Sequence, residues 1–166
     1  DVRDNGGAMR TNAAKLAARF THEEVTTAYM CHKTGTGHTD FSSPEAVTVK
    51  PSDGIRWQKP VVLLTNRSSY SATNDFVNAM RQFPLVTVMG DRTGGGSGMP
   101  FSSELPNGWA VRFLACPVYG SGMEQLEFGI EPDIQVDMTE ADMARGLDTI
   151  IEEARKYLAL NRTGLF

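Results

Sequence analysis

The sequence lacks an excess of basic residues and any long apolar run, and both absences exclude broad classes of function. Sixteen Lys and Arg stand against 20 Asp and Glu, which gives a formal net charge of −4. Nucleic-acid binding needs a basic face for the phosphates, and this sequence offers none. No hydrophobic stretch approaches the roughly 20 residues that cross a bilayer. We therefore expect neither a nucleic-acid partner nor a membrane-spanning segment in this chain.

Cysteine is also scarce, since only Cys31 and Cys116 occur in 166 residues. Each falls in a predicted strand, so we expect two buried free thiols rather than a disulfide. His22, His32 and His38 are not spaced as metal ligands, and no cluster of Cys, His and Asp accompanies them. No metal and no other cofactor is therefore expected.

A glycine-rich segment at residues 90–98 lacks what the familiar glycine motifs require. It has no Lys before Ser97, as a phosphate-binding loop would, and it does not run into a clear helix. No Gly-Ser-Gly triplet of the chain completes Gly-x-Ser-x-Gly, which argues against the nucleophile turn of an α/β-hydrolase. These absences favour a loop that borders a substrate cleft, where Gly94, Gly95 and Gly96 let an extended peptide pair by its backbone.

The order of the predicted elements indicates one layered α/β domain. Hydrophobic residues make up 40% of the chain, which is enough for a substantial core. Helices are predicted at 8–20, 75–83 and 140–160, and strands at 26–33, 45–50, 61–64, 85–89 and 109–116. The first helix would place Leu16 on its buried face, and the last would be one long amphipathic helix with Met143 on its buried side. A hairpin turn is expected at residues 106–108, Pro-Asn-Gly. Strands and helices that alternate in this way are typical of an α/β sheet protein.

The strongest chemical signal lies at residues 68–74, Ser-Ser-Tyr-Ser-Ala-Thr-Asn. This segment joins the bulky apolar run at 61–64, a predicted buried strand, to the helix that follows. At such a turn the Ser71 hydroxyl lies beside free backbone N–H groups and the positive end of the helix dipole, which stabilise an alkoxide or a nearby oxyanion. The alternative is that Ser69 or Ser71 only caps the helix, because serine is common at that position.

Three further segments add to the Ser71 segment. They are residues 1–7 (Asp-Val-Arg-Asp-Asn-Gly-Gly), the glycine loop at 90–98, and residues 128–136 (Phe-Gly-Ile-Glu-Pro-Asp-Ile-Gln-Val). In this order and spacing the four segments resemble the S41 peptidases, the tail-specific or C-terminal-processing family that includes the tricorn core protease. The resemblance implies a ClpP/crotonase-like spiral of ββα units, hydrolysis of peptide bonds in protein or peptide substrates, and a location in the bacterial cell envelope or periplasm.

The resemblance also assigns parts of a catalytic site. In the family the nucleophile opens a Ser-Ala-Ser-Glu-like stretch, and the Ser-Ala-Thr-Asn that begins at Ser71 matches it. The Ala72 N–H would be one oxyanion donor. The other would come from the turn at Gly6 and Gly7, with Gly7 favoured, since a residue without Cβ lets the backbone approach a substrate carbonyl. The strands that precede these two turns must then be neighbours in the sheet.

The general base is the part of this comparison that does not match. The tail-specific branch uses a Lys from the glycine loop, but Gly96 stands at that position, and no Lys occurs between Lys59 and Lys156. The tricorn-like branch uses a His that lies upstream of the Asp-x-Arg strand and is held by further polar residues, including a Glu. Glu127 is the best match to that Glu, and Glu124 is the alternative.

In the family the Asp-x-Arg strand lies well inside the protein. We therefore interpret residues 1–166 as a C-terminal fragment of an S41-type catalytic domain. The leading segment, the tricorn-like His and any PDZ domain would lie outside it. The alternative function is a non-catalytic peptide- or small-ligand-binding module on the same scaffold, as in the retinoid-binding repeats that resemble this family. A base within hydrogen-bond reach of Ser71 would favour the enzyme, and an apolar pocket without one would favour binding.

Overall fold

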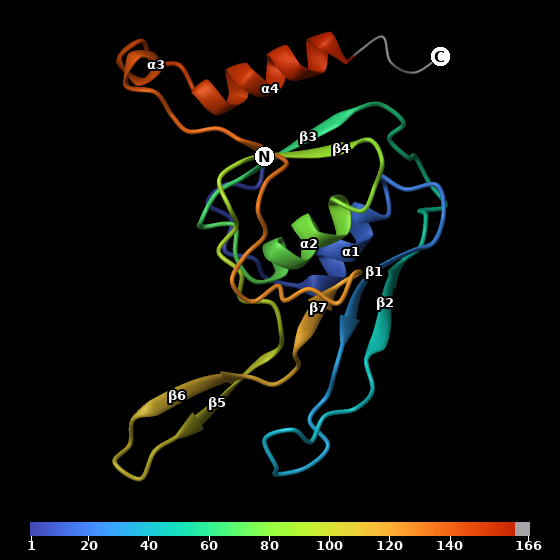
Figure 1. The fold of residues 1–166 in the computed structure, drawn as a ribbon, viewed down its shortest axis with the longest axis vertical. Coiled ribbons are helices and arrows are strands. Elements are labelled where there is room, and N and C mark those ends of the chain that lie inside the picture. The colour runs from blue at the N-terminus through green and yellow to red at the C-terminus, as the bar shows by residue number, and fades with distance from the viewer. Residues whose placement is uncertain (162–166) are drawn as a thin grey trace.

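The computed structural model describes residues 1–161 and shows a mixed α/β fold (Figure 1). Its helices are α1 (Arg10–Ala17), α2 (Ala72–Met80), α3 (Glu140–Ala144) and α4 (Thr149–Leu160). Its strands are β1 (Val25–Met30), β2 (Glu45–Val49), β3 (Val61–Thr65), β4 (Val86–Gly90), β5 (Pro100–Glu104), β6 (Ala110–Leu114), β7 (Val118–Gly120) and β8 (Ile134–Gln135). No helix in the described part of the chain is long and apolar enough to cross a membrane.

Two three-stranded sheets lie on opposite sides of α1 and α2 (Figure 1). One is parallel, in the order β3-β4-β8, with Leu63 opposite Val88. The other is antiparallel, in the order β2-β1-β7, with Tyr29 opposite Tyr119. Strands β5 and β6 form a separate hairpin, which projects away from both sheets.

The side chains of β3 and β4 alternate between two apolar cores. Leu63 and Val88 belong to the core that contains α2. Leu64 and Met89 point the other way and pack against α4, where Ile150 is buried. Because these strands are covered on both faces, their apolar runs are continuous rather than alternating. The layers therefore run from α4 through the parallel sheet and the α1–α2 pair to the antiparallel sheet (Figure 1).

The helix predicted at 140–160 is two helices, α3 and α4. Gly146 has a φ of 70°, a left-handed conformation that ends α3. Asp148 then begins α4, because its carboxylate accepts from the N–H groups of the first turn. Met143, which was expected on the buried side, is 52% exposed. The prediction of one continuous amphipathic helix was wrong because both capping signals interrupt it.

The other two helices differ from prediction at their ends. Helix α2 begins at Ala72, so Ser71 directly precedes its first turn. Helix α1 is shorter than predicted, and Leu16, expected on its buried face, is 52% exposed. Because α1 packs chiefly against α2, only a narrow stripe of it is covered, and Ala17 lies in that stripe with no exposed surface.

Cys31 and Cys116 lie just beyond the ends of β1 and β6 rather than within strands. The strands predicted at 26–33 and 109–116 were therefore too long. Pro117 separates β6 from β7, and it has no backbone N–H with which to continue a ladder. Both thiols are free and buried, as predicted.

Candidate functional site

Ser71 occupies the turn between β3 and α2 in a strained backbone conformation. Its φ is 59° and its ψ is −124°, a combination that residues with a Cβ rarely adopt. Its side chain makes no capping hydrogen bond. Ser69 does not cap the helix either, because its hydroxyl donates to the Val2 carbonyl oxygen and accepts from the Asn66 N–H. The helix-cap alternative is therefore wrong, and strain of this kind gathers at functional sites.

Ser71 and Glu127 line one cavity of about 320 Å³, although they are distant in sequence. Its other walls come from the segment before α2, from the glycine loop and from the β5–β6 hairpin. These lining residues are Tyr70, Gly96, Pro100, Arg112, Phe113 and Leu114. The fold thus brings together the two side chains that sequence analysis proposed for catalysis.

The Glu127 carboxyl lies in a poorly solvated position. Burial raises the pKa of Glu127 because the charged form loses water. Its Oε2 atom is buried and has no hydrogen-bond partner among residues 1–161. Glu124, the alternative, forms an ion pair with Arg81 and accepts from the Gly122 N–H. Of the two glutamates, only Glu127 lines the Ser71 cavity.

The glycine loop holds the Ser71 segment through its backbone. The Gly94 N–H donates to the Ser69 carbonyl oxygen at 2.9 Å. The Gly95 carbonyl oxygen accepts from the Ser71 N–H at 2.8 Å. These groups are engaged within the protein, and Gly96 is the glycine of this trio that lines the cavity. A role for the loop in pairing with a substrate strand stays a prediction.

The backbone at position 96 suits glycine. Gly96 has a φ of 75°, a conformation that strains any residue with a Cβ. The ring of Tyr70 lies where a Cβ would project, and because that ring is 47% exposed it would have to move for a larger residue. A lysine at this position would therefore cost backbone strain and displacement of Tyr70.

No Lys or His of the described residues lines the Ser71 cavity. His32 lies elsewhere, with its Nδ1 at 3.4 Å from the Cys116 sulfur and its Nε2 at 3.9 Å from the Glu45 carboxylate. Within residues 1–161, no group of three or more His, Cys, Asp or Glu side chains could hold a metal ion. Among the described residues, the lining of this cavity therefore includes a serine hydroxyl and a carboxyl group but neither Lys nor His.

The Gly6–Gly7 turn lies against the start of α2. The Val2 N–H donates to the Leu64 carbonyl oxygen at 3.0 Å, so the N-terminal segment runs beside β3. The predicted adjacency of the two segments is thereby confirmed, although residues 1–3 form no strand. A Cβ on Gly7 would lie 2.6 Å from the Ala72 nitrogen, so only a glycine permits this approach.

The Gly7 N–H is nevertheless engaged within the protein. It donates to Asn5 Oδ1 at 2.9 Å, and the same oxygen accepts from the Thr73 hydroxyl at 2.9 Å. Gly7 and Ala72 line a second cavity, of about 230 Å³, which Ser71 does not line. An oxyanion hole formed by Ala72 with Gly7 or Gly6 stays a prediction, and it requires Gly7 to exchange its Asn5 partner for the substrate.

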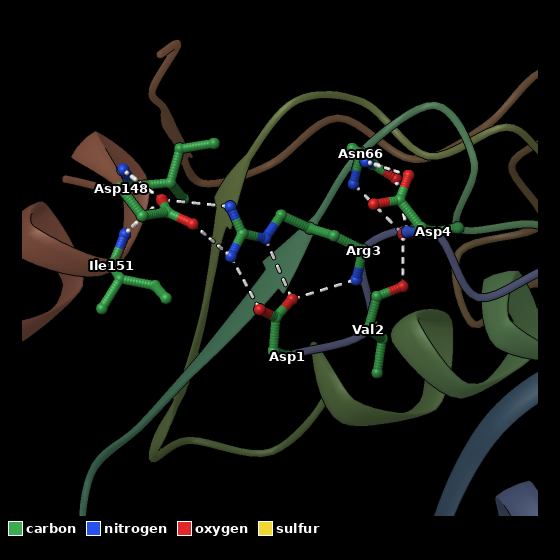
Figure 2. A network of polar contacts seen from close by, with 9 residues as sticks. Asp1, Val2, Arg3, Asp4, Asn66, Asp148 and Ile151 are labelled. Atoms are coloured by element: carbon green, nitrogen blue, oxygen red, sulfur yellow. Dashed lines mark hydrogen bonds and ion pairs between the residues drawn. The ribbon is translucent and has the colours of Figure 1, made fainter. Parts of the chain in front are cut away.

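A charged network anchors the start of the N-terminal segment (Figure 2). The Arg3 guanidinium lies 2.7 Å from the Asp1 carboxylate and 2.8 Å from that of Asp148. Asp4 and Asn66 exchange two hydrogen bonds, each of 3.0 Å. The pKa of Asp148 is lowered, chiefly because its carboxylate accepts a hydrogen bond from Arg3. The network ties the segment that leads into the Gly6–Gly7 turn to the end of β3 and to α4.

Asn74, whose role sequence analysis did not identify, joins α2 to the glycine loop. It has no exposed surface. Its Nδ2 donates to Ser97 Oγ at 2.7 Å and to the Leu126 carbonyl oxygen at 3.2 Å, and its Oδ1 accepts from Thr93 Oγ at 2.5 Å. Asn74 and Asn78, four residues apart and so on one face of the helix, were the signal available in the sequence, because both are polar residues in a helix that is otherwise largely apolar.

Comparisons with known proteins agree with these features. The family model described as Peptidase family S41 matches residues 1–136. A crystal structure of a candidate peptidase from Parabacteroides merdae is 55% identical with a TM-score of 0.93, and it covers 99% of this chain and 52% of that chain. A candidate tricorn-like protease C-terminal subunit from Sulfurisphaera tokodaii is 32% identical over 105 residues, which are 59% of this chain and 12% of that protein.

A more distant solved structure shares the fold. The photosystem II D1 C-terminal processing protease is 19% identical with a TM-score of 0.62, and the match covers 95% of this chain and 37% of that chain. The chain thus spans about half the length of the Parabacteroides relative and less of the other two.

Proposed function

The chain belongs to peptidase family S41, and from this premise we propose that it is part of a serine-type endopeptidase or C-terminal processing peptidase. Ser71 is the nucleophile, and the substrate is a peptide bond of a protein or peptide. The observation that carries the proposal is the strained, uncapped Ser71, which lines the same cavity as Glu127, a half-buried residue whose carboxyl Oε2 has no hydrogen-bond partner among residues 1–161.

In the proposed reaction Ser71 Oγ forms a bond to the scissile carbonyl carbon, and negative charge develops on the carbonyl oxygen. The Ala72 N–H and the N-terminal end of α2 stabilise that charge, together with the Gly7 N–H once it has left Asn5. One such donor typically contributes about 3 kcal/mol of transition-state stabilisation. In the next step the C–N bond breaks, and the amine leaves with the proton that Ser71 gave up. The acyl group stays on Ser71, and water then removes it.

The Ser71 proton needs an acceptor. We propose that a histidine outside this chain takes it, as in the tricorn-like branch, and that Glu127 orients that histidine. The raised pKa of Glu127 supports this role, because a carboxylate that has lost water gains from a cationic partner. A non-catalytic binding module is not favoured, since the family and its solved relatives are peptidases.

Three further expectations belong to the same proposal. Residues 1–166 form a C-terminal segment of the catalytic domain, and their layered sheets and helices are part of a ClpP/crotonase-like spiral. The proposed location is the bacterial cell envelope or periplasm, which cell fractionation tests directly.

The decisive experiment is Ser71→Ala in the complete protein. It should lower the rate of peptide hydrolysis by several powers of ten and abolish labelling by a fluorophosphonate, while the melting temperature stays the same. Ser68→Ala is the matched control, because Ser68 is exposed and lies three residues before Ser71. Turnover that survives Ser71→Ala would remove Ser71 from the mechanism.

A further inference from the structure

The β5–β6 hairpin, which projects from the fold in Figure 1, forms a wall of the Ser71 cavity. Its register pairs Pro100 with Leu114 and Ser102 with Arg112. Cross-strand partners share a face, and so do alternate residues along a strand. Pro100, Arg112 and Leu114 therefore lie on one face of the hairpin, and all three line the cavity, together with the adjacent Phe113. The hairpin thus brings Arg112 to the same cavity as Ser71.

Arg112 carries a charge that the described part of the chain does not neutralise. Seven other arginines there form ion pairs with Asp or Glu, whereas Arg19 and Arg56 form none; the seven are Arg3, Arg10, Arg67, Arg81, Arg92, Arg145 and Arg155. Arg112 forms no ion pair within residues 1–161. A guanidinium in this state is free to bind a carboxylate with two parallel hydrogen bonds.

Glu127, across the same cavity, does not fill this role. A nearby cation would lower the pKa of its carboxyl group, whereas burial raises that pKa. Arg112 is exposed in the free protein, and the neighbouring Pro100, Phe113 and Leu114 add apolar surface to the same wall. A peptide bound against this wall would displace water from it, and charges attract more strongly where water is excluded.

We propose that Arg112 binds the side-chain carboxylate of an Asp or Glu residue next to the scissile bond. This inference rests on the proposed function, since it concerns the peptide that Ser71 attacks. A peptide whose carbonyl reaches Ser71 occupies the cavity that the hairpin bounds, so a neighbouring side chain meets the Arg112 face. Arg112 is in this view a specificity-determining residue and takes no part in breaking the bond.

A binding experiment tests the inference without turnover. The complete protein with Ser71→Ala, which keeps bound peptide intact, is used to select from a library of N-acetylated, C-terminally amidated octapeptides. Blocked ends leave side chains as the sole source of negative charge. We expect enrichment of Asp and Glu at one position. The enriched peptide should bind about tenfold more weakly, by fluorescence anisotropy, when that residue is replaced by Asn or Gln.

Variants of the hairpin then identify the residue responsible. With Arg112→Gln added, the acidic and amide peptides should bind equally, and with Arg112→Glu a Lys peptide should be preferred. Arg145→Gln is the control, because Arg145 is an exposed arginine directly after α3, and α3 lies at the opposite end of the molecule from the hairpin (Figure 1). This variant should keep the preference for acids.

Two results would overturn the inference. One is selection of peptides without an acidic preference, and the other is an acidic preference that survives Arg112→Gln. The proposed function is judged separately, by whether protein with Ser71 intact cleaves the selected peptides and Ser71→Ala does not.

Discussion

Replacing Asn74 by alanine tests how the turn that carries Ser71 is held. The Asn74 side chain makes three buried hydrogen bonds, two as donor to Ser97 and Leu126 and one as acceptor from Thr93. All four residues are at most 2% exposed, so water cannot replace the lost partners. Asn74→Ala therefore removes three hydrogen bonds and leaves buried polar groups without partners.

Each buried hydrogen bond contributes about 1 kcal/mol net to stability, so Asn74→Ala should cost about 3 kcal/mol. For a domain of 166 residues, each kcal/mol shifts the melting temperature by roughly 2–4 °C. The expected fall is therefore roughly 6–12 °C. Thr93 Oγ still accepts from the Ile130 N–H, which limits the disruption to its donor side. The glycine loop should loosen, and labelling of Ser71 by a fluorophosphonate should slow.

Thermal unfolding and labelling rates of the purified protein provide the measurement. Asn12→Ala is the control, because Asn12 is an exposed asparagine in helix α1, and it should change stability by less than about 0.5 kcal/mol. If Asn74→Ala shifts the melting temperature no more than Asn12→Ala does, the network contributes nothing and this account of the turn is wrong.

Two more substitutions test the loop and the buried carboxyl group. Because burial raises the pKa of Glu127 above its ordinary 4.5, the folded protein holds this proton at pH values where the unfolded chain has released it. Stability is thus lost as pH rises, so Glu127→Gln should raise the melting temperature at pH 7 and not at pH 4; an equal effect at both would contradict the shift. At Gly95, with a φ of 79°, a Cβ would overlap the Glu127 carbonyl oxygen, whereas at Gly108, with a φ of 84°, it would meet open space. In urea denaturation Gly95→Ala should cost about 3 kcal/mol from strain and overlap, and Gly108→Ala only about 1 kcal/mol from strain, so equal costs would show that the loop is not tightly packed.

The sequence predicted the parts of the site that depend on local signals. A continuous apolar run followed by a serine-rich turn and a helical pattern placed Ser71 between β3 and α2, and the structure agrees. The split between α3 and α4 was also visible locally, since Gly146 and Asp148 are typical capping residues. Hydrophobic periodicity outweighed those two signals in the prediction and led to one long helix.

Other parts of the site depend on contacts between distant segments, and no local pattern reports them. In the sequence Asn74 is only a polar residue at the start of a predicted helix. Its hydrogen bonds to Thr93 and Leu126 form when distant segments pack against that helix. The hairpin turn at 106–108 was recognised, but nothing in its sequence states that β5 and β6 reach the Ser71 cavity. Arg112 was consequently missed, because its importance comes from the register of the hairpin and not from its neighbours in the chain.

The Asn5 contact explains how the proposed oxyanion hole could favour the transition state over the bound substrate. At rest the Gly7 N–H donates to the neutral carbonyl oxygen of the Asn5 side chain. A neutral peptide carbonyl offers Gly7 an equivalent partner, so exchange on substrate binding brings little gain. An oxyanion offers a charge-assisted hydrogen bond, which is roughly twice as strong as a neutral one. Gly7 would therefore leave Asn5 chiefly as charge develops at Ser71, and an interaction made only in the transition state is the kind that accelerates a reaction.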